Sequence, residues 1–164
     1  MNVIFLEPGF PANQRRFVKA LRDVGAAVHG IGDRPLDWMD DELKGWLSSY
    51  RQVVNVTDEG ALEAAVRDAQ GQVWIDRLEV AVEAHVMAAA HVRERCWIPG
   101  VSARTAYLCR DKVAMKEVLR EAGVPTAASA GMSSAAEAHE FARAVGYPVI
   151  VKPRDAAGGR SPAR

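Results

Sequence analysis

Two lysines stand out as the residues whose type and spacing could carry chemistry. Lys152 ends the apolar run 147–151 and is followed by a small-residue loop that contains Ala157, Gly158 and Gly159. A lysine at the end of a strand is a fixed positive charge, and a loop of Ala and Gly lets backbone N–H groups approach a phosphate closely. These features indicate a site for a phosphate-bearing ligand.

Lys112 is the other of the two lysines and lies forty residues before Lys152 in the sequence. Periodicity predicts one helix over residues 105–122, with Leu108, Met115 and Leu119 on its apolar stripe. Lys112 lies near the edge of that stripe. Periodicity alone favours a side chain that extends past the core to water over one that reaches a ligand.

The region that precedes this helix alternates short apolar runs with amphipathic stretches. Strands are predicted at residues 3–6, 26–31, 52–56 and 72–75, each followed by a helix, the last of them beginning near Leu78. This alternation predicts an α/β fold, a doubly wound and mostly parallel sheet with helices on both faces. Ligands of such sheets bind beyond the carboxyl ends of the strands, so the loop Glu7–Asn13 is the place to look. The alternative is a proline-rich turn without a ligand, and no G-x-G-x-x-G motif supports a dinucleotide there.

The second region is expected to be α+β and incomplete. After the helix at 105–122, a short strand is predicted at 127–132 and a helix capped by Ser134 ends at Gly146. Residues 147–152 then form a predicted strand with no evident hairpin partner, since Pro162 would interrupt a returning strand. We therefore predict two domains, residues 1–103 and a truncated domain at residues 104–164.

Composition bounds the partners of the protein. The chain has 164 residues, with 21 basic and 21 acidic side chains and a net charge of zero. This balance gives no support for nucleic acid or an anionic membrane as a partner. No apolar stretch approaches the roughly 20 residues that span a membrane, and no basic leader precedes the run 3–6. We expect a cytoplasmic protein.

The candidate metal ligands are the acidic run 40–42, two histidines and two cysteines. Contiguous carboxylates point in different directions on a helix, so the acidic run is better explained as a helix cap. His85 and His91 are six residues apart and do not share a helix face, so we interpret them as ordinary histidines. Cys96 and Cys109 lack metal-ligand spacing and are expected to be free thiols.

The second region resembles the ATP-grasp superfamily, to which biotin carboxylase and carboxylate–amine ligases belong. The resemblance rests on the order of the segments Asp111-Lys112, 122–126, the capped helix, 146–153 and the loop 156–159. It covers residues from about 104 to 159, and the preceding region fits the Rossmann-like pre-ATP-grasp domain of that superfamily.

The resemblance implies a role for each candidate residue. Lys112 corresponds to the first ATP-contacting lysine, and Lys152 to the second, which reaches the α- and β-phosphates. Ala157, Gly158 and Gly159 correspond to the start of the glycine-rich loop that closes over the phosphates. ATP and Mg²⁺ are the implied cofactors. The Mg²⁺ ligands and the catalytic residues are expected downstream of residue 164, so the chain itself is predicted to contain none of either.

The implied reaction is the activation of a carboxylate by MgATP as an acyl phosphate, followed by attack of an amine or similar nucleophile. The partners are then ATP and an unidentified carboxylate, and the resemblance also allows a homodimer. On this interpretation the chain is the N-terminal part of a ligase, with partial ATP binding and no activity alone. The alternative is a standalone α/β binding or interaction module with Lys112 and Lys152 on its surface.

Overall fold

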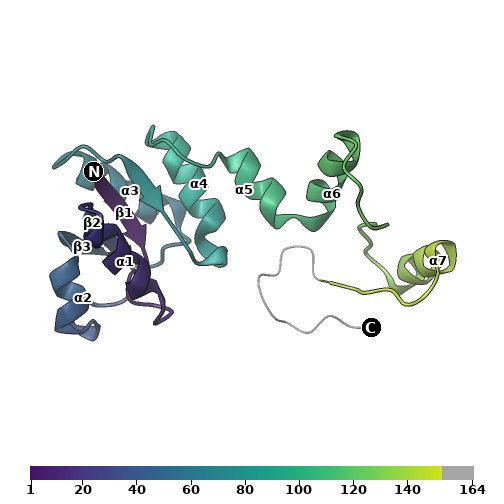
Figure 1. The fold of residues 1–164 in the computed structure, drawn as a ribbon, viewed down its shortest axis with the longest axis horizontal. Helices are drawn as coiled ribbons and strands as arrows, with labels where there is room; N and C mark the ends of the chain where they lie inside the picture. Colours follow the sequence, from purple (N-terminus) through teal and green to yellow (C-terminus); the bar gives the residue numbers. More distant parts are fainter. Residues whose placement is uncertain (153–164) are drawn as a thin grey trace. The chain divides into compact units, whose positions relative to one another are not determined.

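The computed structural model describes residues 1–152, which divide into two compact units between Ala106 and Tyr107. The order of elements is shown in Figure 1. Their bounds are β1 Asn2–Leu6, α1 Gln14–Asp23, β2 Ala27–Gly32, η1 Leu36–Trp38, α2 Asp41–Trp46, β3 Ser49–Gln52, α3 Glu59–Gln70, β4 Arg77–Glu79, η2 Glu83–His85, α4 Val86–Arg95, α5 Ala103–Arg110, α6 Lys112–Glu121 and α7 Ala135–Val145.

The first unit is built around a parallel sheet of four strands in the order β3-β2-β1-β4. Every strand pair is parallel, and Ile4 of β1 lies between His29 of β2 and Leu78 of β4. The predicted parallel α/β fold is therefore confirmed. The chain builds the sheet outward from β1 to β3 and then crosses to β4, so the topological switch point lies between β1 and β4.

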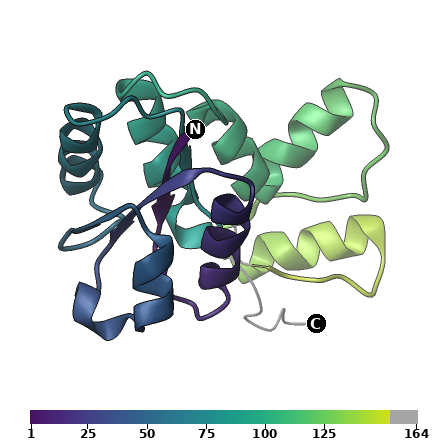
Figure 2. The same cartoon turned by 60° about the vertical axis from the view of Figure 1, so that its left-hand side comes forward.

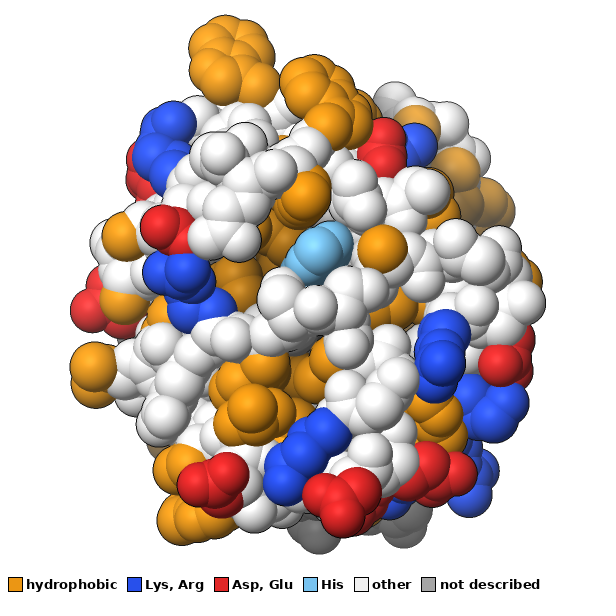
Figure 3. Space-filling view, turned by 90° about the vertical axis from the view of Figure 1, so that its left-hand side faces the viewer, with side chains coloured by type: hydrophobic (Ala, Val, Ile, Leu, Met, Phe, Trp, Pro, Cys, Tyr) orange, Lys and Arg blue, Asp and Glu red, His pale blue; other side chains and the backbone are white. Residues whose placement is uncertain are grey.

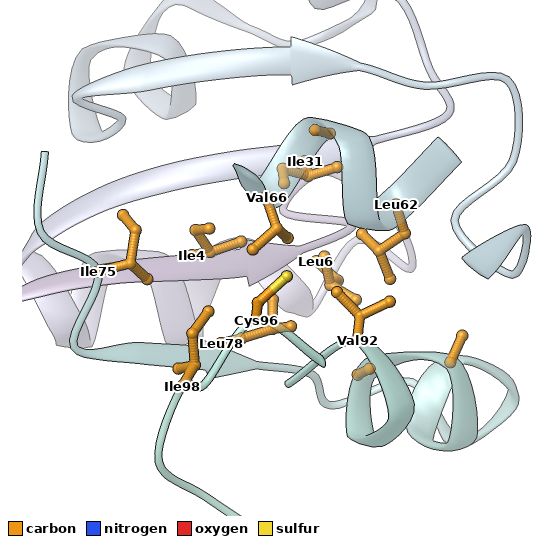
Figure 4. Packing of buried hydrophobic residues seen from close by; sticks show 13 residues of the cluster. Ile4, Leu6, Ile31, Leu62, Val66, Ile75, Leu78, Val92, Cys96 and Ile98 are labelled. Atoms are coloured by element: carbon orange, nitrogen blue, oxygen red, sulfur yellow. The ribbon is translucent and has the colours of Figure 1, made fainter. Parts of the chain in front are cut away.

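Both faces of the sheet are covered by helices, because alternate side chains of a strand point to opposite faces. On one face, Ile4 and Leu6 pack with Leu62 and Val66 of α3 and with Val92 of α4. Figure 4 shows these side chains directed toward one another, together with the other labelled members of that cluster. The opposite face is smaller.

Phe5 and Val28 form the sheet side of that smaller cluster, and they pack with Val18 of α1 and Leu43 of α2. The purple and blue helices in Figure 2 are α1 and α2. The two clusters together make the sheet doubly wound.

Helix starts follow the capping residues that the sequence offers. The side chains of Asp40 and Asp58 accept hydrogen bonds from the N–H groups of Leu43 and Ala61, which opens α2 and α3. The prediction that the acidic run 40–42 caps a helix is confirmed by Asp40, and Asp58 plays the same part for α3.

The predicted third strand at 52–56 was wrong in its position. Helix α2 ends at Trp46 and Tyr50 enters β3, where its hydroxyl donates to the carbonyl of Arg34 at 2.6 Å. Val54, which the prediction counted as a strand residue, is 94% exposed. A short apolar run resembles a strand, but the pairing with β2 decides which residues form one.

The predicted fourth strand at 72–75 was also displaced. β4 begins at Arg77, and Leu78, which was predicted to begin a helix, is fully buried opposite Ile4. The backbone N–H of Asn2 donates to the Asp76 carboxylate at 2.7 Å, which aligns the strand beside β1. The helix of this segment, α4, therefore begins only at Val86.

In the second unit, the single helix predicted over 105–122 is two helices. Asp111 interrupts it, because its side chain accepts hydrogen bonds from the N–H groups of Val113 and Ala114 and caps α6. The predicted cap at Ser134 is confirmed, because its Oγ accepts from the N–H of Glu137. The Glu137 carboxylate accepts from the N–H of Ser133, one residue before the cap.

The two strands predicted in the second unit do not form as elements within residues 1–152. Residues 127–132 have no regular secondary structure, and the run 147–152 contributes a single bridge at Val151. Tyr147, Ile150 and Val151 are exposed. A β-strand needs hydrogen-bonding neighbours, and apolar sequence alone does not supply them.

The revised position of β4 leads to a stability prediction. Leu78→Ala should lower the free energy of unfolding by about 2–5 kcal/mol, because it leaves a cavity in a packed cluster. Ile150→Ala, a matched truncation of an exposed side chain, should change it by less than about 0.5 kcal/mol. Urea unfolding followed by circular dichroism measures both. Equal effects of the two substitutions would contradict the burial of β4.

Candidate functional site

Glu7 is placed at the carboxyl edge of the sheet, directly after β1. It is 4% exposed, and its φ of 52° lies in the left-handed region that is uncommon for residues other than glycine. Its Oε1 accepts the backbone N–H of Asp33 at 2.6 Å, which joins the ends of β1 and β2. A buried carboxylate with strained backbone at a switch-point loop is a candidate functional residue.

The electrostatics around Glu7 are mixed. Burial raises the pKa of the Glu7 carboxyl, the hydrogen bond from the Asp33 N–H lowers it, and the neighbouring Asp33 carboxylate raises it again. Arg34 lowers this pKa in turn by its positive charge. The net result is a pKa above the ordinary value, because burial removes water that would stabilise the charged form of the Glu7 carboxyl.

Tyr50 closes this edge from the side of α2. A Cβ on Gly30 would lie 2.8 Å from the Tyr50 ring, and one on Gly32 would lie 2.7 Å from the Tyr50 hydroxyl oxygen. The two glycines of β2 therefore make room for the ring. Burial raises the pKa of the Tyr50 hydroxyl, and the negative charges of Glu7 and Asp33 raise it further.

A cavity of about 170 Å³ opens beside Glu7. Its lining comes from the loops after β1 and β2 and from the start of α2: Glu7, Gly9, Ala12, Arg15, Arg34, Trp38, Met39, Asp40 and Leu43. We call it the β1–β2 cavity. It lies within the first unit, beyond the carboxyl ends of β1 and β2, on the other side of β1 from the switch point.

The two arginines of the β1–β2 cavity differ in their partners. Arg15 forms ion pairs of 2.6 Å with both Asp40 and Glu42. Arg34 lies over the ring of Phe10, with its guanidinium carbon 3.8 Å from the ring centroid. Within the described residues, no carboxylate comes within ion-pair distance of the Arg34 guanidinium. Of the two arginines that line the cavity, Arg34 is the one without an ion pair to the described residues.

His85 lies after β4, across the switch point from Glu7. Its Nδ1 is buried and has no hydrogen-bond partner among the described residues. Burial lowers the pKa of His85, and the charge of Asp33 opposes that shift. The interpretation of His85 as an ordinary surface or hydrogen-bonded histidine is therefore incomplete, whereas His91 pairs with Glu59 at 2.6 Å.

Lys112, the first of the two predicted phosphate contacts, is the first residue of α6. Its side chain is half-buried, and Asp111 beside it is 8% exposed. A helix N-terminus carries a partial positive charge, so a lysine there adds to a field that attracts anions.

Lys152 is the last residue that the structure describes, and its side chain is exposed. It belongs to the same unit as Lys112. Ala157, Gly158 and Gly159 lie outside the described residues. The assignment of these five residues to a phosphate site therefore stays a prediction.

Sequence reasoning pointed to the loop after β1 but missed Asp33 and Arg34. Both follow β2 directly, and β2 is the neighbour of β1. The rule that directed attention to the first loop applies equally to the loop of the adjacent strand. The signal was present in the charged pair that ends the second apolar run.

Other expectations concern thiols, metals and membranes. Cys96 and Cys109 are free, as predicted, and Cys96 is buried. Residues 1–152 contain no group of three or more His, Cys, Asp or Glu side chains that could hold a metal ion. None of the helices described is long and apolar enough to cross a membrane. On the face drawn in Figure 3, basic and acidic side chains are interspersed.

Comparison with known proteins gives a family match in the second half of the chain. The family described as "Carbamoyl-phosphate synthase L chain, ATP binding domain" matches residues 111–162. The N-terminal section of the carbamoyl phosphate synthase large chain of Methanopyrus kandleri is 29% identical over 146 residues. That alignment covers 86% of this chain and 25% of the relative.

Solved structures show the same fold. The biotin carboxylase domain of the 2-oxoglutarate carboxylase of Hydrogenobacter thermophilus, in complex with MgADP, aligns with a TM-score of 0.74 at 22% identity. N5-carboxyaminoimidazole synthetase of Staphylococcus aureus, complexed with ADP, aligns with a TM-score of 0.72 at 17% identity. These alignments cover 97% and 96% of this chain, and 36% and 39% of the two structures.

The burial of Glu7 leads to a prediction about pH. Because the folded-state pKa lies above the ordinary value of 4.5, the folded protein binds the proton more tightly. The Glu7 contribution to stability therefore falls as the pH rises from that value through the folded pKa. Glu7→Gln keeps an acceptor for the Asp33 N–H and removes the desolvated charge.

We expect Glu7→Gln to be at least as stable as the parent at neutral pH, with the difference shrinking as the pH falls toward 4.5. Thermal unfolding across this range measures the difference, and Glu117→Gln on the exposed side of α6 is the matched control. A variant that is less stable at neutral pH, or a difference independent of pH, would contradict the argument.

Proposed function

We propose that this chain supplies phosphate contacts of the ATP site in a ligase that activates a carboxylate. The observation that carries the proposal is the family match over residues 111–162, which contains both Lys112 and Lys152. The resemblance to ATP-grasp enzymes over nearly the whole fold supports it. Since the chain spans 25% of the curated relative and less than two fifths of the two solved structures, the activity is proposed for the longer protein.

Lys112 is proposed to bind phosphate oxygens from the first turn of α6. The Asp111 carboxylate caps this helix by accepting the N–H groups of Val113 and Ala114, and the helix N-terminus is positive. A triphosphate beside it would be attracted both by the lysine and by the partial positive charge of the helix end.

Lys152 is proposed to bind the α- and β-phosphates, with the backbone of Ala157, Gly158 and Gly159 covering them. Lysines on two different elements can hold a flexible triphosphate from two sides. Lys152 is exposed, so its ammonium is accessible to a ligand and can donate hydrogen bonds to phosphate oxygens.

The proposed reaction has two steps. A carboxylate oxygen of the substrate attacks the γ-phosphorus of ATP, forming a C–O–P linkage while the bond from that phosphorus to the β–γ bridging oxygen breaks and ADP leaves. An amine or similar nucleophile then attacks the acyl carbon, loses a proton and releases inorganic phosphate. The part of the lysines is to position and neutralise the phosphates, as in other phosphoryl transfers.

Mg²⁺ does not fit the residues that the structure describes, because residues 1–152 contain no cluster of metal-ligating side chains. No step is therefore assigned to a metal here. Acidic ligands elsewhere in the longer protein would have to hold it. We accordingly propose that the 164-residue chain binds ATP weakly and does not turn it over alone.

The second unit favours this proposal over a compact, self-contained binding module. Its apolar side chains at Val124, Val145, Ile150 and Val151 are all more than 40% exposed. Exposed apolar residues on an unpaired segment are typical of a surface that another part of a protein covers.

Nucleotide binding tests the two lysines. Lys112→Ala and Lys152→Ala should each weaken the binding of ATP by about tenfold or more, since each removes a charged hydrogen bond. The same substitutions should weaken the binding of AMP by less, because AMP lacks the β- and γ-phosphates. Titration of a fluorescent ATP analogue with competition by ATP and AMP measures this, and Lys19→Ala on the exposed side of α1 is the control.

Two results would contradict the proposal. The first is equal ATP affinity in the parent and in both lysine variants. The second, which concerns inactivity alone, is measurable ATP turnover by the purified chain that Lys152→Ala abolishes.

A further inference from the structure

We propose that the β1–β2 cavity binds a small zwitterion, a free α-amino acid, with its ammonium toward Glu7 and its carboxylate toward Arg34. This site lies in the first unit and is distinct from the lysines of the proposed ATP site. Binding stands on the cavity alone, whereas a role for the amino acid as substrate rests on the proposed function.

The Glu7 end of the cavity is suited to a cation. Glu7 is buried beside the Asp33 carboxylate, and the two negative charges add to the effect of burial, the larger cause, in raising the pKa of the Tyr50 hydroxyl. Two neighbouring carboxylates repel each other, and an ammonium between or beside them relieves that repulsion. A primary ammonium also supplies three hydrogen-bond donors in a small volume.

Arg34 gives the cavity a group suited to a carboxylate. It lines the same space as Glu7, and one face of its guanidinium lies over the Phe10 ring. A guanidinium edge binds a carboxylate through two parallel N–H groups. Glu7 and Arg34 do not form an ion pair with each other, so both charges are available to one ligand.

The remaining lining does not change this balance of charge. Arg15 and Asp40 both line the cavity, but they pair with each other at 2.6 Å. The other walls are apolar and come from Trp38, Met39 and Leu43. They are suited to an apolar side chain of the ligand.

The size of the cavity favours a metabolite as small as an amino acid. Its volume of about 170 Å³ is below the roughly 300–1,000 Å³ of pockets for drug-sized ligands. It is also several times the roughly 30 Å³ that one water molecule occupies in the liquid. Gly9 keeps the space open, since a Cβ there would lie 3.5 Å from Met39 and 3.7 Å from Leu43.

The test uses the 164-residue chain without nucleotide, so that its outcome is independent of the ATP site. Isothermal titration with L-leucine, L-methionine and L-phenylalanine measures binding. N-acetyl-L-leucine lacks the ammonium, and L-leucinamide lacks the carboxylate. We expect saturable binding of at least one free amino acid, and binding of both blocked forms weaker by about tenfold or more.

Variants assign each end of the ligand. Arg34→Gln should weaken the binding of the free amino acid by about tenfold, so that it binds no more tightly than the amide. In Glu7→Gln, the free amino acid should bind no more tightly than the N-acetyl form. Gly9→Ala adds a methyl group at ordinary contact distance and should weaken every ligand without unfolding the chain, as thermal unfolding will verify.

Arg22→Gln, at the exposed end of α1, is the matched control and should bind as the parent does. The proposal is overturned if no common amino acid binds at millimolar concentration, or if the blocked forms bind as well as the free ones. It is overturned equally if Arg34→Gln and Arg22→Gln behave alike. Such a failure would leave the nucleotide proposal standing, and failure of the lysine variants would leave this one standing.

Discussion

Strand β1 lies between β2 and β4 and must bury every side chain from Val3 to Leu6, each at most 2% exposed. A strand buried on both faces needs a layer on each face. That requirement places α3 and α4 on the side of Ile4 and Leu6, and α1 and α2 on the side of Phe5. It also means that the chain leaves the sheet at its centre, so Glu7 emerges among the ends of neighbouring strands rather than in open solvent.

The strained and poorly solvated position of Glu7 follows from this exit point. The backbone turns through a left-handed conformation there, and the carboxylate is held by the Asp33 N–H. Gly30 and Gly32 allow Tyr50 to pack across β2, and Tyr50 in turn fixes the carbonyl of Arg34. The same constraint that builds the core therefore brings an anionic and a cationic side chain to the lining of one cavity. Strain and desolvation of this kind usually persist where a ligand is bound.

Local signals predicted most of the first unit, and long-range pairing explains what they missed. The run 3–6 and the capped helix after Asp58 were predictable, because burial on both faces and side-chain caps are written into neighbouring residues. The true positions of β3 and β4 were not predictable from neighbouring residues. They depend on pairing with β2 and β1, which leaves Val54 outside β3 and places Leu78 within β4. Asp33 and Arg34 were missed for the same reason. Asp111 is a different case, because the error there was local. Its capping side chain divides into α5 and α6 a stretch that periodicity predicts to be one helix.

Phosphate is proposed to bind to the second unit and a zwitterion to the first, and hydrogen–deuterium exchange tests that division most directly. A nonhydrolysable ATP analogue should slow amide exchange around Lys112 and in the segment that leads to Lys152, and leave β1 to β4 unchanged. An amino acid that binds should slow exchange in the loops after β1 and β2 and leave α6 unchanged. Protection of the same segments by both ligands, or protection by the nucleotide confined to the first unit, would contradict the account.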